Sequence, residues 1–140
     1  MNVTEIPYNK FVGIKRAGKS EYLLELDESD DYLNHLGNVH AGAQLSLAEA
    51  ASGEYLLQMF EDSASKFIPV VRRMESKFKK PAKGKVFARA KTSALALEIF
   101  KEELKLKGRS LIGVEVNIED ANHVVTMSAV VEWYVQEVIN

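Results

Sequence analysis

Apolar and polar residues alternate in several segments of the chain, and a period of two is typical of half-buried antiparallel strands. The alternation is strictest over residues 112–119, and the turn-forming residues 120–122 separate this segment from another apolar one at 124–135. The pattern therefore predicts two long antiparallel strands near the C-terminus. Four further strands are expected on the same grounds, at 11–17, 21–26, 70–80 and 86–92, and the first two should form a hairpin.

A long run of helix-forming residues, 41–60, interrupts this series of strands. On a helical wheel its polar residues scatter around the whole circumference and form no stripe. A helix without a clear polar face is predicted to be largely buried. A second, short amphipathic helix is expected at 97–107, ending at Gly108.

Six strands, with one buried helix inserted after the second, predict an α+β domain in which a curved antiparallel sheet wraps around the helix. The 140 residues show no linker, repeat or low-complexity tract, so one domain over 1–140 is expected. The absence of cysteine excludes disulfides, thiol nucleophiles and thiolate metal sites. No signal-like segment begins the chain, and acids interrupt its most apolar stretch, 45–60. We therefore expect a cytoplasmic protein that does not enter a membrane.

The net charge of −2 conceals an uneven distribution of charge. Six acidic residues lie between 21 and 31, whereas nine basic residues and a single acid lie between 72 and 91. A basic strip on a mildly acidic protein favours a small polyanionic ligand over nucleic acid, which usually calls for a basic domain. The alternative is a solvated pair of strands whose edges carry lysines.

Candidate chemistry is concentrated in residues 34–42, directly before the long helix. This segment contains His35, His40 and two glycines, and a helix N-terminus can hold an anion or a developing oxyanion. Further into the helix, Glu49 has no basic residue among its helical neighbours. We expect its pKa to be raised, which suits a general base, although a structural glutamate is the alternative. His35, His40 and Glu49 match no metal-ligand spacing, so no metal site is expected.

The order of these residues resembles the active-site segment of hotdog-fold acyl-CoA thioesterases of the phenylacetate-pathway (PaaI-like) type. The likeness rests on Asn34, on His40 six positions later, on the small pair Ala41-Gly42, and on Leu47-Ala48-Glu49-Ala50-Ala51. The predicted order of strands and helix is also that of the family, including the two long strands after Gly108-Arg109. The resemblance therefore covers nearly the whole chain and implies a hotdog fold.

The same resemblance implies hydrolysis of an acyl-CoA or related thioester, without a cofactor. Glu49 would be the nucleophile or the general base on water, and Asn34 would orient the water or the acid. His40 would lie beside the thioester, while the N–H of Ala41 would polarise its carbonyl oxygen. In the family the acid of one subunit faces the loop of another, so a homodimer or homotetramer with shared sites is implied. The candidate substrate-binding residues are Gly42 and, for the phosphates of CoA, Arg72, Arg73, Lys79, Lys80 and Lys83.

Two other functions stay open on the sequence. A hotdog 3-hydroxyacyl dehydratase or hydratase has a histidine fourteen positions before the helix glutamate, as His35 precedes Glu49, but the usual proline-rich loop between them is absent here. A domain that binds an acyl thioester without cleaving it is suggested by two departures from the thioesterase pattern. These are Ala41 in place of a glycine and Val71 in place of a serine or threonine. The thioesterase also accounts for Asn34, and it is the preferred hypothesis.

Overall fold

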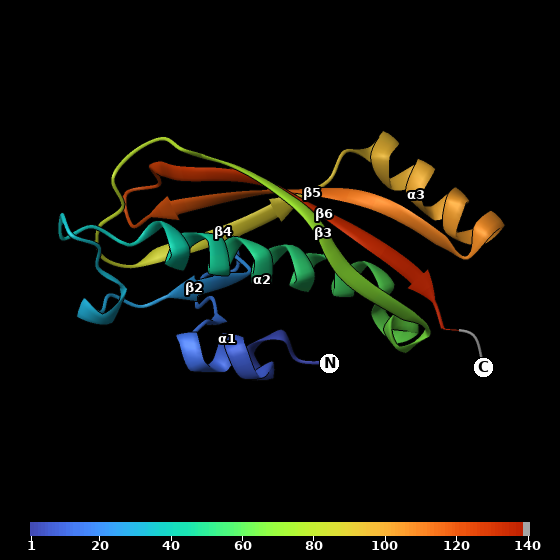
Figure 1. Cartoon of the computed structure of the whole chain (residues 1–140), viewed down its shortest axis with the longest axis horizontal. Coiled ribbons are helices and arrows are strands. Elements are labelled where there is room, and N and C mark those ends of the chain that lie inside the picture. Colours follow the sequence, from blue (N-terminus) through green and yellow to red (C-terminus); the bar gives the residue numbers. More distant parts are fainter. Residues whose placement is uncertain (139–140) are drawn as a thin grey trace.

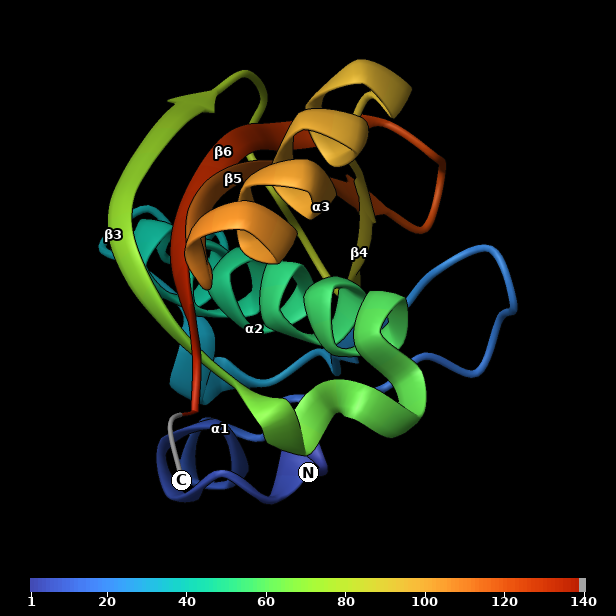
Figure 2. The ribbon, with the colours of Figure 1, turned by 90° about the vertical axis from the view of Figure 1, so that its right-hand side faces the viewer.

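The structure, a computed structural model, describes residues 1–138 and contains one antiparallel sheet of six strands in the order β1-β2-β4-β5-β6-β3. The strands are β1 (Lys15–Arg16), β2 (Leu24–Leu26), β3 (Phe67–Phe78), β4 (Val86–Lys91), β5 (Arg109–Asp120) and β6 (Val125–Glu137). The sheet curves around the long helix α2 (Ala41–Phe60), whose bounds are those that the sequence predicts (Figures 1 and 2). The predicted α+β architecture, a curved antiparallel sheet around a central helix, is confirmed.

The strand predicted at 11–17 is largely wrong. Phe11 lies in a short helix, α1 (Pro7–Val12), which ends at Gly13 in the left-handed conformation with φ of 92°. A Cβ on Gly13 would collide with the hydroxyl of Tyr32, so glycine is required there for a second reason. Proline at the first helical position and glycine just after the last are the features that favour a helix here. Only β1 remains of the predicted strand, and it pairs with a β2 that is shorter than expected.

The remaining elements connect or close the sheet. Helix α3 (Ala94–Lys107) begins three residues before its predicted start because Ser93 caps it, and it ends at Gly108 as predicted. It packs against β5 and the end of α2, where the ring centroids of Phe60 and Phe100 lie 6.1 Å apart. Three short 3-10 helices complete the chain, η1 (Val3–Glu5), η2 (Asp30–Tyr32) and η3 (Glu61–Lys66).

Several polar residues of α2 are buried, which explains why they form no stripe on the wheel. Each has a partner outside the helix, and these pairs are Gln44 with Thr126, Ser52 with Trp133, and Glu54 with Arg16. The face that stays half-exposed carries Gly42, Ser46, Glu49, Gly53 and Leu57, at helical spacing. The helix therefore turns a face of mostly small residues, with one carboxylate, away from the core.

The two edges of the sheet differ in length. β1 has two residues, whereas β3 has 12 and exposes about half of the side chains of Ile68 (53%) and Val70 (54%). The pairing of β3 with β6 shifts register between Val71 and Arg73, so Arg72 forms a bulge. A long edge strand with apolar side chains is a template for pairing with another strand.

The bond between Ser52 and Trp133 offers a test of how the helix is held. Ser52→Ala removes the acceptor of the buried Trp133 Nε1–H, which lies 2.9 Å from Ser52 Oγ. Because an unpaired buried donor costs about 1–3 kcal/mol, we expect the free energy of unfolding to fall by that amount in denaturant titrations. Ser20→Ala, at an exposed turn position, is the control and should change it by less than about 0.5 kcal/mol. Equal losses in the two variants would contradict the anchoring role.

Candidate active site

Asn34 closes the loop that leads into α2. Its Oδ1 accepts hydrogen bonds from the backbone N–H groups of Leu36 (2.9 Å) and Asn38 (3.0 Å), and Leu33 bridges to Val39 across the base of the loop. The oxygen of the Asn34 amide is thereby committed to the loop. Its Nδ2 group makes no hydrogen bond to any residue in 1–138 and is available to donate to a ligand.

His40 caps the N-terminus of α2. Its Nδ1 accepts the backbone N–H of Gly42 at 2.8 Å, so the neutral ring carries its hydrogen on Nε2 and can donate away from the helix. The N–H of Gly42 is occupied by this bond. The N–H of the exposed Ala41 has no partner within residues 1–138, which leaves it as a donor at the positive end of the helix.

A cavity of about 340 Å³ lies beside this loop and brings four of the predicted site residues together. They are Asn34, Ala41, Lys79 and Lys80. Asn38 also lines the cavity, and its Oδ1 is buried without a hydrogen-bond partner among the described residues. An acceptor of this kind suits a ligand N–H. Sequence reasoning did not single out Asn38, since an asparagine in a Gly-Asn loop is indistinguishable from an ordinary turn residue.

Glu49 lies on α2 at a second cavity, of about 330 Å³. Burial raises the pKa of its carboxyl, as predicted from the sequence. No side chain in the described part of the chain forms an ion pair or hydrogen bond with this carboxylate. Glu49 therefore combines partial burial with an unneutralised charge, a combination common in catalytic acids and bases.

Within one chain, Glu49 does not meet the loop. It lies eight residues after Ala41, or about 12 Å along the helix axis at 1.5 Å per residue. No described residue lines both the cavity of Glu49 and that of Asn34. The chain thus presents two separate groups of candidate residues at different positions along α2.

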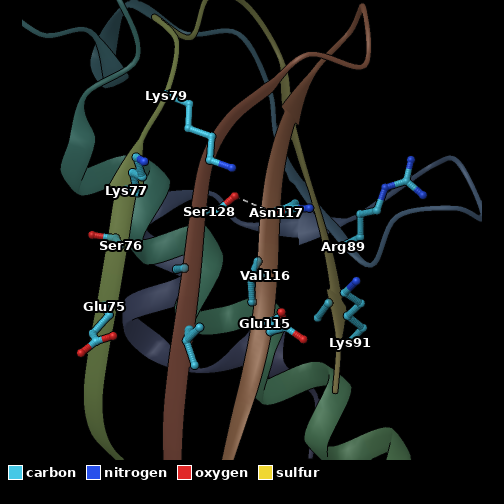
Figure 3. Close-up of a pocket in the computed structure, with 13 residues that line it drawn as sticks. Glu75, Ser76, Lys77, Lys79, Arg89, Lys91, Glu115, Val116, Asn117 and Ser128 are labelled. Carbon is cyan, nitrogen blue, oxygen red and sulfur yellow. Dashed lines mark hydrogen bonds between the residues drawn. The ribbon is translucent and has the colours of Figure 1, made fainter. Parts of the chain in front are cut away.

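The basic strip is divided among several parts of the surface. A cavity of about 670 Å³ lies on the face turned away from α2 (Figure 3). A row of side chains crosses four strands there, from Lys77 through Ser128 and Asn117 to Arg89, and Ser128 Oγ donates to Asn117 Oδ1 at 2.7 Å. Of the residues proposed to bind CoA, only Lys79 lines this cavity. Lys79 also lines the cavity beside Asn34.

The other proposed cations lie elsewhere. Arg72 is the exposed bulge residue of β3, and Arg73 forms an ion pair with Glu75. Lys83 lines a small cavity beside the acidic segment 27–30. Lys79 and Lys80 are therefore the basic residues that the structure places with the loop.

In the described part of the chain, no group of three or more histidine, aspartate or glutamate side chains is arranged to hold a metal ion. No helix among residues 1–138 is both long enough and apolar enough to cross a membrane.

Solved structures with the same arrangement define the class of fold. One is a Pseudomonas aeruginosa protein of unknown function, described as a probable thioesterase; its TM-score is 0.80, with 24% sequence identity over 97% of this chain and 91% of that one. A thioesterase from Haemophilus influenzae has a TM-score of 0.73, with 18% identity over 99% of this chain and 88% of that one. A Bacillus halodurans protein solved with CoA has a TM-score of 0.69, with 18% identity over 91% of this chain and 74% of that one. The hotdog fold that the resemblance implied is confirmed.

The family follows from the sequence itself. Residues 6–135 match the model of DUF4442, described as a domain of unknown function, and the chain belongs to this family. No curated protein matches the chain significantly.

The raised pKa of Glu49 predicts a dependence of stability on pH. The unfolded chain holds the carboxyl near its ordinary pKa of 4.5, so the folded state binds the proton more tightly than the unfolded state does. The contribution of Glu49 to stability is therefore greatest below the ordinary value and is lost as the pH rises through the raised one. We expect Glu49→Gln to raise the Tm near pH 7, with a gain over wild type that disappears below about pH 4.

Glu54→Gln is the matched control on the same helix. Glu54 is buried but contacts Arg16 at 2.6 Å, so its replacement removes a favourable partner and should lower the Tm near neutral pH. A Glu49→Gln variant that is also less stable than wild type near pH 7 would show that the Glu49 carboxylate stabilises the fold.

Proposed function

We propose that the protein hydrolyses acyl thioesters of the acyl-CoA type, at sites formed between two copies of the chain. The observation that carries the proposal is Glu49, a half-buried carboxylate with a raised pKa and no partner among residues 1–138. It lies on the helix whose N-terminus offers the N–H of Ala41, which is free in the same part of the chain. The similar structures described as thioesterases, and the one solved with CoA, support the same reaction class.

Two copies are needed because one chain separates the groups by about 12 Å. Ala41 and Glu49 each lie four residues from Leu45, so two α2 helices packed antiparallel about a two-fold axis level with Leu45 bring each Glu49 level with the second copy's Ala41. The long β3 edge offers a continuous surface for the same association.

In the proposed site, Glu49 removes a proton from a water molecule as the water oxygen attacks the thioester carbonyl carbon. The carbonyl oxygen becomes an oxyanion and accepts the N–H of the second copy's Ala41, assisted by the helix dipole. Collapse of the intermediate breaks the C–S bond, and the proton held by Glu49 passes to the departing sulfur. The products are a carboxylic acid and a thiol. The amide Nδ2 of the second copy's Asn34 orients the water.

The loop cavity supplies the contacts for the thiol portion of the substrate. Lys79 and Lys80 can pair with phosphate groups of the thiol portion. His35 is exposed and lines neither this cavity nor that of Glu49 among the described residues. A dehydratase, which needs His35 opposite Glu49, is therefore the less favoured function.

A panel of acyl-CoA substrates assayed by release of free thiol tests the reaction. We expect turnover in the wild type, and a loss of at least about 100-fold in Glu49→Ala, because the general base is removed. Asn34→Ala should also lose activity, whereas His35→Ala is the control and should keep it. Binding without turnover would identify a non-catalytic acyl thioester receptor. Hydration of a crotonyl thioester that depends on His35 and Glu49 alone would identify a dehydratase.

The shared site has its own test, in hybrids of two inactive variants. Random exchange of Glu49→Ala and Asn34→Ala subunits makes about half of the dimers mixed, and each mixed dimer has one site with both groups intact. We expect mixing to restore about a quarter of wild-type activity. No recovery, with subunit exchange verified by mass spectrometry, would place all catalytic groups of a site on one chain.

A further inference from the structure

The cavity that contains Glu49 continues along α2, away from the loop. Its α2 lining runs from Glu49 to Leu57, eight residues or about 12 Å along the axis. The start of β3 and Trp133 of β6 form its other walls, together with residues from the N-terminus of the chain. The cavity is therefore a channel that begins at the candidate catalytic carboxylate.

The lining of this cavity is apolar beyond Glu49. Glu49 is the only charged side chain among the described residues that form it, and Asn9, the only neutral polar one, donates through Nδ2 to the carbonyl of Val3 at 3.0 Å. A polar group carried along the channel away from Asn9 would lose its water without finding a partner, at a substantial cost. Such a space suits a ligand with an unsubstituted apolar body and a reactive head at the Glu49 end.

Gly53 and Trp133 form the floor of the channel. A Cβ on Gly53 would lie 3.4 Å from Cζ2 of the indole, so the missing side chain leaves the ring exposed to the cavity. The indole is fixed, since its Nε1 donates to Ser52 Oγ at 2.9 Å. A larger residue at position 53 would fill the channel one helical turn after Glu49.

The wall opposite the sheet comes from the N-terminal segment, through Met1, Val3, Ile6 and Asn9. α1 is tied to α2 by a hydrogen bond between Tyr8 Oη and Ser46 Oγ of 2.9 Å. Val3 is buried, and Ile6 lies partly exposed at the mouth. The segment before β1 thus closes a space that the sheet and α2 leave open.

We propose that this channel holds the acyl chain of the substrate, and that residues 1–9 together with Gly53 make it select straight, unsubstituted aliphatic chains. The assignment to an acyl chain rests on the proposed thioesterase function. The charged and polar loop cavity of the second copy then binds the thiol portion of the substrate. The thioester group, which joins the acyl and thiol portions, lies at Glu49.

Trp133, the single tryptophan of the chain, reports occupancy of the channel without any turnover. Its fluorescence is measured while the intact protein is titrated with straight-chain primary alcohols, which are neutral and avoid repulsion by Glu49. We expect the Kd to fall about fourfold for each added methylene until the channel is full, the factor that burial of one methylene gives. The diol 1,8-octanediol should bind at least about tenfold more weakly than 1-octanol, because its second hydroxyl is buried unpaired.

Two variants locate the binding. Gly53→Val fills the floor and should weaken 1-octanol binding by at least about tenfold, the effect of closing several methylene positions. Phe11→Ala is the matched control on the N-terminal segment, since Phe11 is 88% exposed and lies outside the described cavity lining; its affinity should stay at the wild-type value. If Gly53→Val fails to fold by circular dichroism, the chain-length series and the diol comparison on the wild type decide the matter. No fluorescence response, equal binding of alcohol and diol, or unchanged binding by folded Gly53→Val would overturn the proposal.

A second arm follows kcat/KM along a series of straight-chain acyl-CoA substrates. We expect the same rise of about fourfold per methylene, lost in Gly53→Val but kept in Phe11→Ala. Alcohol binding with no hydrolysis of any thioester would refute the proposed function while supporting an apolar channel. Hydrolysis that is indifferent to chain length, in a protein that binds no alcohol, would refute the channel and support the proposed function.

Discussion

The rotation of α2 about its own axis is the constraint on which the candidate site depends. Gln44, Ser52 and Glu54 are buried on α2, and each is paired with a group outside the helix. Buried polar groups that lose their partners are costly, so the helix can adopt only the rotation that satisfies all three. That same rotation leaves Glu49 on the half-exposed face. The direction of the carboxylate is thus fixed by residues that never touch a substrate.

This arrangement separates the groups that stabilise the fold from the group suited to chemistry. Glu54 and Glu49 lie on the same helix five positions apart, yet one is paired with a guanidinium and the other with nothing in the described structure. A carboxylate without a partner destabilises the folded state in proportion to the shift of its pKa. The hydrogen bonds and the ion pair of the buried polar residues of α2 offset the free energy that the unpaired Glu49 carboxylate costs. The fold can therefore retain Glu49 as a base of raised pKa.

The fold could be predicted where a single pattern dominates a segment. The alternation at 112–119 and the run of mostly helix-forming residues at 41–60 specify β5 and α2 because both are long. The N-terminal segment is short and mixed, and its alternation favoured a strand over the helix indicated by Pro7 and Gly13. The bulge at Arg72 has no signature in the sequence, because it arises from the fit of β3 to β6 rather than from local preference.

The candidate site was predictable as a set of residues and less so as an arrangement. Local motif order was sufficient to single out Asn34, His40 and Glu49, and partial burial of the acid follows from its apolar neighbours along the helix. Their separation into two cavities depends on the position of each residue along the axis of α2. The apolar channel depends on contacts between segments far apart in sequence. The basic strip was read as one surface, whereas the fold distributes its residues. Lys77 and Arg89 line the cavity on the outer face of the sheet, Arg72 lies in the bulge of β3, and Lys80 and Lys83 lie in the connection between β3 and β4.

The unequal lengths of the two edge strands limit how many copies of the chain can associate by strand pairing. A strand of two residues offers too few backbone groups to recruit another chain, so β1 is closed to growth, and only β3 can add a neighbour. A unit with one usable edge is saturated after a single pairing event, in the way that a monovalent reagent terminates a polymer. Pairing through β3 therefore gives a closed assembly and not an open fibre, although the edge itself is long and apolar.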